Sequence, residues 1–312
     1  MRWRPSPKPS PRCSAGSTRW RGREMQPIPR ARLMVGTAGF GAWIGEARAH
    51  DIVGRALALG LRRFDTAASY GAAEAILGAA LAGRGTAVGI ATKISPEADL
   101  DLCRPLPGQI LALVERSLHR LRRDRLDLLQ WHDPLPPALA GPAFATLADL
   151  RRQGLIGAIG LCNHDLAALD AVPDIAGTAP VLLQNQHSLL HSDLTPGLTA
   201  RCAGRGLAVW AWSPLAGGLL AGRYGVADPR PAGSRAARGG WLPVGDTGPL
   251  LPALDALKAR HGGGLARAAL DWVLATPGVT GAILGPSRPE HLDLIGPADP
   301  GGDQERAATT IW

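Results

Sequence analysis

Short apolar segments alternate with amphipathic segments along most of the chain, and this alternation limits the folds that it can adopt. Eight segments have the length and composition of strands, at residues 33–36, 63–65, 88–93, 126–132, 158–162, 181–184, 207–213 and 280–284. Helical patterns lie between or after them, near residues 48–59, 73–82, 109–121, 143–153, 165–171, 199–204, 267–275 and 289–295. Strict alternation implies parallel strands, because parallel neighbours require crossover connections. We therefore expect an α/β fold, a single (β/α)8 TIM barrel over residues 25–312.

A doubly wound open sheet is the alternative architecture, but no G-x-G-x-x-G sequence follows the first strand, so the phosphate loop of a Rossmann domain is missing. The interval between the seventh and eighth strands is the longest. It contains a Gly-, Pro- and Arg-rich segment at residues 222–249 and an extra helix near residues 252–260. Long irregular segments of this kind are disordered or act as active-site lids. We expect residues 222–249 to form a mobile lid, since they leave the barrel face where active sites lie.

Charge and composition exclude several classes of function. The net charge is +8, but residues 1–24 carry seven Lys or Arg against Glu24, which is +6, so the other 288 residues carry only 8 − 6 = +2. The body of the protein therefore gives no reason to expect nucleic-acid binding. No apolar run approaches the roughly 18 residues that span a bilayer, so no membrane segment is expected.

The first 24 residues read as a disordered basic extension without the apolar stretch of a secretory signal, and we expect translation to start at Met25. The four cysteines form no C-x-x-C pair and no metal-ligand spacing. They predict reduced thiols, a cytoplasmic location and no metal site.

Four polar residues are expected at one rim of the barrel. Lys93 is one of only three lysines in a chain with 34 Lys and Arg, and Tyr70 is one of only two tyrosines. Asp65, Lys93 and His132 end the second, third and fourth predicted strands, and Tyr70 follows Asp65 by five residues. Each alone has a structural explanation, as a helix cap, a snorkelling lysine, a packing ring or a turn residue. Their convergence at the carboxyl ends of strands favours an active site.

This set of residues suits proton transfer to a carbonyl oxygen. An ammonium near a phenol stabilises the phenolate, so we expect Lys93 to lower the pKa of Tyr70 by about two to three units. Asp65 would keep Lys93 charged, and His132 would orient the substrate oxygen. The set contains no nucleophile and no metal cluster, so the electrons must come from a cofactor.

Seven motifs resemble those of the aldo-keto reductase family, in order and at suitable intervals, over residues 33–296. They are GTAGFG, FDTAASYG with AEAILGAAL, ATK, LDLLQWHDP, LIGAIGLCNHD, LQNQHSLLHSD and AWSPLAGGLLAGRY. The resemblance implies a TIM barrel that uses NADPH, or NADH, without a Rossmann fold. It also implies that Asp65, Tyr70, Lys93 and His132 form a catalytic tetrad, with Tyr70 as general acid in reduction or general base in oxidation.

The resemblance carries a set of coenzyme contacts onto this sequence. They are Gly36, Thr37, Ala38, Asp65, Cys162, Asn163, Gln184, Trp212, Ser213, Pro214, Leu215, Gly217, Leu219, Gly285, Ser287, Arg288 and His291.

Two regions depart from the family pattern. At the nicotinamide end, Asn163 and Gln184 would face the carboxamide, Cys162 replaces the usual Ser, and Trp212 stands where an aromatic ring, most often Tyr, lies under the nicotinamide. At the adenosine end, Gly285 stands where many NADPH-dependent members carry Lys and His291 where they often carry Arg, which leaves Arg288 to bind a 2′-phosphate.

Three functions are compatible with these residues. The first is a reductase of aldehydes, ketones or sugar-like carbonyls, and the second is a dehydrogenase that oxidises a sugar hydroxyl with the same tetrad. The third is a cofactor-sensing regulatory subunit, since some family members serve as channel partners. In each enzymatic case the partner is a small carbonyl compound or sugar. The C-terminal segment is too rich in Gly, Pro and Asp to indicate a particular substrate.

Overall fold

The structure is a computed structural model that describes residues 28–84, 87–239, 242 and 246–296. The predicted N-terminal extension and the expected start at Met25 lie outside these residues.

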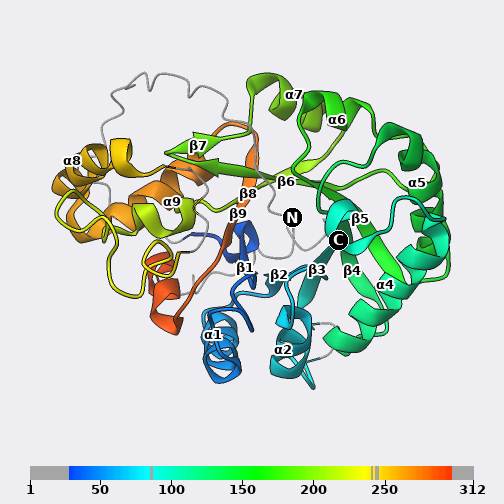
Figure 1. Ribbon diagram of the computed structural model, residues 1–312, viewed down its shortest axis with the longest axis horizontal. Helices are drawn as coiled ribbons and strands as arrows, with labels where there is room; N and C mark the ends of the chain where they lie inside the picture. Colours follow the sequence, from blue (N-terminus) through cyan, green and yellow to red (C-terminus); the bar gives the residue numbers. More distant parts are fainter. Residues whose placement is uncertain (1–27, 85–86, 240–241, 243–245, 297–312) are drawn as a thin grey trace.

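Eight parallel strands close into a barrel (Figure 1). Their order is β5-β4-β3-β2-β1-β9-β8-β6, and pairing of β5 with β6 closes the ring. The strands are β1 (Leu33–Gly36), β2 (Arg63–Asp65), β3 (Gly89–Ile94), β4 (Leu126–Trp131), β5 (Ile156–Cys162), β6 (Leu182–Ser188), β8 (Ala208–Trp212) and β9 (Val279–Leu284). The predicted TIM barrel is therefore confirmed.

The helices surround the barrel (Figure 1). They are α1 (Glu46–Ala58), α2 (Ala73–Ala80), α3 (Pro96–Asp99), α4 (Leu106–Leu121), α5 (Pro137–Arg152), α6 (Leu166–Asp170), α7 (Pro196–Gly204), α8 (Leu251–His261) and α9 (Leu265–Ala275). The predicted segment at 289–295 is a 3-10 helix, η6 (Pro289–Ile295).

Some predicted boundaries are wrong for identifiable reasons. The fourth predicted helix begins at residue 143, after a proline, but the matching helix, α5, begins at Pro137 and contains Pro142. A proline in the second turn removes one helical hydrogen bond, and packing of the helix outweighs that cost. The prediction also omits β7 (His191–Ser192), which pairs antiparallel with β6, and the single-turn helix α3. Both are too short to give a periodic pattern.

Two apolar layers hold the barrel together. The interior contains a cluster with one side chain from every barrel strand except β2, namely Met34, Ala91, Leu128, Ala158, Leu182, Trp210 and Ile283. A larger layer between strands and helices contains the apolar faces of α1, α4 and α5. Burial of each large apolar side chain contributes about 1.5–3 kcal/mol. The interior is therefore packed, and polar groups at the carboxyl ends of the strands stand on a rigid base.

The connection from β8 to β9 adds several helices to the barrel. It contains η3 (Ala216–Ala221), η4 (Gly248–Leu250), α8, η5 (Gly262–Gly264) and α9. Tyr224 is buried in a small cluster with side chains of η3, α8 and α9. Farther along, the Arg235 guanidinium lies 5.2 Å from the centre of the Trp43 ring, on the β1–α1 loop. The described part of residues 222–249 is thus anchored at two points. Its mobility stays a prediction.

None of the helices in the described ranges combines the length and apolarity that crossing a bilayer requires.

Candidate active site

Four adjacent segments bring the predicted tetrad to one end of the barrel. Asp65 is the last residue of β2, and Lys93 is the penultimate residue of β3. His132 directly follows β4, and its backbone N–H donates to the carbonyl of Ile94. Tyr70 lies in the turn before α2. Because parallel strands end at the same edge, residues far apart in the sequence meet here.

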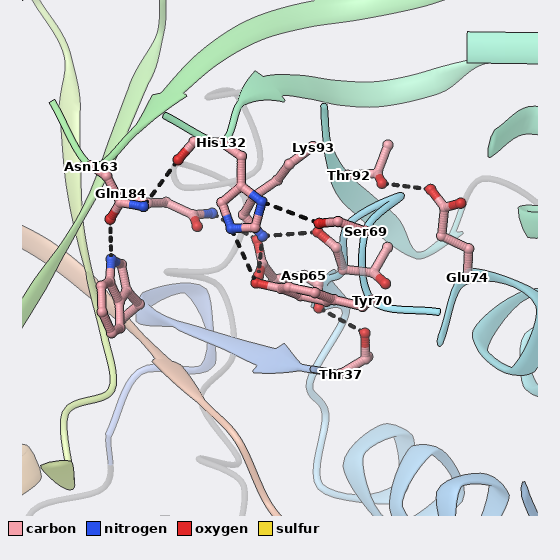
Figure 2. A network of polar contacts seen from close by, with 12 residues as sticks. Thr37, Asp65, Ser69, Tyr70, Glu74, Thr92, Lys93, His132, Asn163 and Gln184 are labelled. Carbon is pink, nitrogen blue, oxygen red and sulfur yellow. Dashed lines mark hydrogen bonds and ion pairs between the residues drawn. The ribbon is translucent and has the colours of Figure 1, made fainter. Parts of the chain in front are cut away.

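The four side chains are in contact or close to it (Figure 2). Lys93 Nζ donates to Asp65 Oδ1 at 2.6 Å and to the carbonyl of Thr66 at 2.8 Å. The same ammonium lies 5.3 Å from the centre of the Tyr70 ring. Tyr70 Oη is 3.5 Å from His132 Nε2. That distance is long for a hydrogen bond, as catalytic contacts often are before substrate binds.

The expected fall in the pKa of Tyr70 is wrong for this state of the protein. Burial raises the pKa of Tyr70 to about 12, although Lys93 acts in the opposite direction. The cost of placing a phenolate in a dry site exceeds the attraction of one ammonium that is already neutralised by Asp65. Tyr70 therefore holds its proton at neutral pH and can donate it.

Lys93 is charged and His132 is neutral in this site. Burial disfavours a charge on Lys93, but Asp65, Tyr70 and Cys162 together outweigh it and raise the pKa of Lys93 above its ordinary value. Burial, helped by the charge of Lys93, lowers the pKa of His132 to about 3. His132 is thus a neutral imidazole that can donate a hydrogen bond to an oxygen without supplying a charge.

Ser69 is a neighbour of His132 that the sequence prediction missed. Its Oγ lies 3.5 Å from His132 Nδ1, so hydroxyl groups of two consecutive residues, Ser69 and Tyr70, face the two nitrogens of one ring (Figure 2). Only its adjacency to Tyr70 could have indicated this.

The residues predicted at the nicotinamide end form a connected hydrogen-bond network. Gln184 Nε2, from β6, donates to Asp65 Oδ2 at 2.8 Å. Asn163 Nδ2, just after β5, donates to the carbonyl of His132 at 3.0 Å and to Asp133 Oδ1 at 3.1 Å. Trp212 Nε1, at the end of β8, donates to Asn163 Oδ1 at 3.0 Å.

These contacts leave the groups that a nicotinamide carboxamide would require. Asn163 Oδ1 retains one lone pair after it accepts from Trp212, and Gln184 retains one amide N–H after it donates to Asp65. One acceptor and one donor match the two ends of a carboxamide. Burial raises the pKa of Cys162, so its thiol is neutral.

Unusual backbone conformations concentrate at this end of the barrel. Among the described non-glycine residues, Arg122, Asn163, Ser213 and Ala216 have positive φ, and the last three lie at the ends of β5 and β8. Such conformations cost about 1–3 kcal/mol each and cluster at functional sites. Ala216 is absent from the predicted set, because nothing in its residue type indicates this strain.

The predicted segment after β8 divides into two parts. The Ser213 hydroxyl accepts from the Gly217 backbone N–H at 3.1 Å, so Ser213, Pro214, Leu215 and Gly217 belong to one tight turn. Leu219 is fully buried in the cluster below it, which leaves only its backbone for a ligand.

The predicted adenosine end lies after β9, where its side chains contact one another. Arg288 Nε is 3.3 Å from His291 Nε2, and the Ser287 backbone N–H is 3.3 Å from His291 Nδ1. Burial, Arg288 and Arg223 all lower the pKa of His291. Arg223 therefore adds a second guanidinium, which the sequence prediction missed. Gly285 leaves open space beside this group, because a Cβ there would meet no atom.

Gly36 ends β1, and Thr37 and Ala38 directly follow it. Thr37 donates to the carbonyl of Asp65 from its backbone N–H at 2.9 Å and from Oγ1 at 3.1 Å. A Cβ at Gly36 would lie 3.1 Å from Ile283 Cγ2, so a larger residue would crowd the rim.

No group of three or more His, Cys, Asp or Glu side chains in the described part of the chain is arranged to hold a metal ion.

Comparison with known proteins places this chain in one class of oxidoreductases. The sequence profile of the aldo/keto reductase family matches residues 32–295. An uncharacterized oxidoreductase of Mycobacterium tuberculosis is 37% identical over 260 residues, covering 82% of this chain and 78% of that protein. A methylglyoxal reductase of Yersinia pestis is 34% identical over 205 residues, covering 62% of this chain and 69% of that protein.

A solved structure agrees with the sequence comparisons. A glycerol dehydrogenase from Gluconobacter oxydans superposes with a TM-score of 0.70 and 25% identity, covering 90% of each chain. The chain belongs to the aldo/keto reductase family and is an oxidoreductase.

Proposed function

We propose that this protein is an NAD(P)H-dependent reductase of small aldehydes, ketones or sugar-like carbonyls, with Tyr70 as the general acid. The observation that carries the proposal is the protonated Tyr70 hydroxyl beside neutral His132, above the buried Lys93–Asp65 ion pair. The methylglyoxal reductase among the relatives supports a small carbonyl substrate.

Each tetrad residue has a separate role in this mechanism. His132 Nε2 and Tyr70 Oη hold the carbonyl oxygen between them. When bound, NAD(P)H supplies the hydride that the carbonyl carbon accepts. As negative charge develops on the oxygen, the Tyr70 proton moves to it. Lys93 stabilises the phenolate that remains, and Asp65 keeps Lys93 in place.

The coenzyme would lie across the strand ends that carry Asn163, Gln184 and Trp212. The carboxamide would take the free lone pair of Asn163 and the free N–H of Gln184, with Trp212 against the ring. Arg288 and Arg223 near His291 favour NADPH over NADH, because guanidinium groups pair with a 2′-phosphate.

Oxidation of a polyol or sugar is the second candidate function. The similarity in fold to a glycerol dehydrogenase favours it, and the same tetrad would act with Tyr70 as the base. The pKa of Tyr70 argues for reduction at neutral pH, since the proton is already on the phenol.

A turnover screen tests the proposal. Purified protein is assayed with short aldehydes, ketones and aldoses and with the corresponding alcohols, each with both coenzymes. Tyr70→Phe should lower carbonyl reduction by at least about 10²-fold and leave coenzyme binding near wild type. The matched control is Tyr224→Phe, which removes the other phenol hydroxyl in the chain and should stay close to wild type. A Tyr70→Phe variant that keeps a tenth of the wild-type kcat would remove Tyr70 from this role. Absent turnover together with a stoichiometric membrane partner would favour a regulatory subunit.

A further inference from the structure

Asp133 follows His132 directly, and the proposed mechanism gives it no role. Its carboxylate is partly buried at the barrel mouth and accepts from Asn163 Nδ2 at 3.1 Å. The Ser95 side chain, directly after β3, lies close enough to act against the rise in pKa that burial gives Asp133. Asp133 therefore lies near the ends of three neighbouring strands, β3, β4 and β5.

The contact continues across the mouth through the Asn163 amide. Both N–H groups of Asn163 are used, one by Asp133 and one by the carbonyl of His132, and its oxygen accepts from the Trp212 indole. Figure 2 shows the contact between the Asn163 amide nitrogen and the backbone carbonyl of His132 as a dashed line. An amide presents nearly the same shape after a half turn about its last bond, so its partners decide which way it faces. Of these three partners, only Asp133 offers a charge-assisted hydrogen bond, which is about twice as strong as a neutral one.

The indole of Trp212 depends on the amide orientation that Asp133 helps to fix. Its N–H requires an acceptor, and the acceptor is the Asn163 oxygen. If the amide turned, an N–H would face the indole N–H, and an oxygen would face the carbonyl of His132. Both contacts would then be repulsive.

We propose that Asp133 is a positioning residue, whose carboxylate fixes the Asn163 amide and, through it, the Trp212 ring. This inference rests on the proposed function, in which Asn163 and Trp212 hold the reactive end of the coenzyme. In this proposal Asp133 acts without touching substrate or coenzyme. Its effect is transmitted by two hydrogen bonds in sequence, Asp133 to Asn163 and Asn163 to Trp212.

The first test uses the protein without coenzyme. The indole N–H resonance of Trp212 is identified in a ¹⁵N–¹H spectrum by its loss in Trp212→Phe. Asp133→Ala should shift or broaden this resonance. Asp133→Asn should shift it less, because the new amide oxygen still accepts from Asn163 although the hydrogen bond is no longer charge-assisted. The control is Glu97→Ala, which removes an exposed carboxylate near Asp133 and should not move the signal.

The second test measures binding and catalysis separately. Asp133→Ala should weaken NADPH binding, measured by fluorescence titration, and lower kcat by about 10- to 100-fold, the range expected when reacting groups are misplaced by up to about an ångström. The primary isotope effect with deuterated coenzyme should rise, since the chemical step would become slower than product release. Asp133→Asn should bring all three quantities part of the way back to wild type, since it keeps the acceptor and loses only the charge.

Two results would overturn the proposal. One is a Trp212 resonance that Asp133→Ala leaves unmoved. The other is an Asp133→Asn variant that is as impaired in catalysis as Asp133→Ala while its Trp212 resonance stays near the wild-type position, which would mean that the carboxylate acts on substrate or coenzyme and not through Asn163. Failure of the proposed function gives a different result: wild type would then turn over no substrate with either coenzyme, while the resonance test would still decide the role of Asp133.

Discussion

Replacement of Lys93 by Met should destabilise the fold as well as remove activity. Lys93 Nζ and Asp65 Oδ1 are 2.6 Å apart, and their side chains are only 2% and 6% exposed. The substitution leaves the Asp65 carboxylate buried, with the Gln184 amide at 2.8 Å as its remaining side-chain partner. Loss of one member of a buried ion pair costs about 3–5 kcal/mol. At about 2–4 °C per kcal/mol for a large domain, the melting temperature should fall by roughly 6–20 °C.

Urea unfolding monitored by circular dichroism measures this loss, and a second substitution identifies its cause. Lys93→Met combined with Asp65→Asn removes the unpaired charge, so it should recover most of the free energy of unfolding while remaining inactive. Since the folded protein raises the pKa of Lys93 above its ordinary 10.5, the ion pair contributes fully below that pH and is lost only above it. The deficit of Lys93→Met should thus be constant from about pH 6 to pH 9. A deficit under about 1 kcal/mol, or a double variant no more stable than Lys93→Met, would refute the electrostatic reasoning.

Four further predictions concern pH, coenzyme and the β8–β9 connection. Folding lowers the pKa of His132 from 6.5 to about 3, so the folded protein loses stability as pH falls below 6.5. His132→Gln should remove about 2–3 kcal/mol of the stability loss between about pH 7 and pH 4.5, measured by urea unfolding. Carbonyl reduction should be flat in initial-rate assays from about pH 6 to pH 9, whereas alcohol oxidation, which needs ionised Tyr70, should accelerate with pH; a flat oxidation profile would contradict this. Arg288→Ala should weaken NADPH binding by about 10- to 150-fold and leave NADH binding nearly unchanged. Equal affinity of wild type for NADPH and NADH would contradict this prediction. Residues 222–249 should gain protection from hydrogen exchange when coenzyme binds; protection gained only elsewhere at the mouth would reject the lid.

The fold was predictable because its signal is repeated eight times along the chain. Each strand and its helix carry their own apolar pattern, and β1 and β2 have the predicted bounds. Short elements were not predictable, since β7 depends on its pairing with β6 rather than on its own two residues. The start of α5 was missed because packing offsets the local penalty of Pro142.

The members of the site were predictable, but their charge states were not. Asp65, Lys93 and His132 lie at or next to the ends of β2, β3 and β4, and strand order brings them together. The pKa of Tyr70 depends on how completely the surrounding elements exclude water, and no residue type reports that quantity. Ser69 and Asp133 escaped notice for a related reason, since their contacts with His132 and Asn163 exist only in three dimensions.

Burial and charge act against each other at Tyr70, and their balance favours one direction of reaction. Burial dominates before substrate binds, so the phenol holds its proton up to about pH 12 and reduction starts from the common protonation state. Oxidation must start from the phenolate, whose population falls tenfold for each pH unit below the pKa. Lys93 lowers that cost without removing it, because much of its field is neutralised by Asp65 at 2.6 Å. The ion pair thus stabilises the phenolate that reduction leaves behind, yet it does not deprotonate Tyr70 in advance, as an efficient proton donor requires.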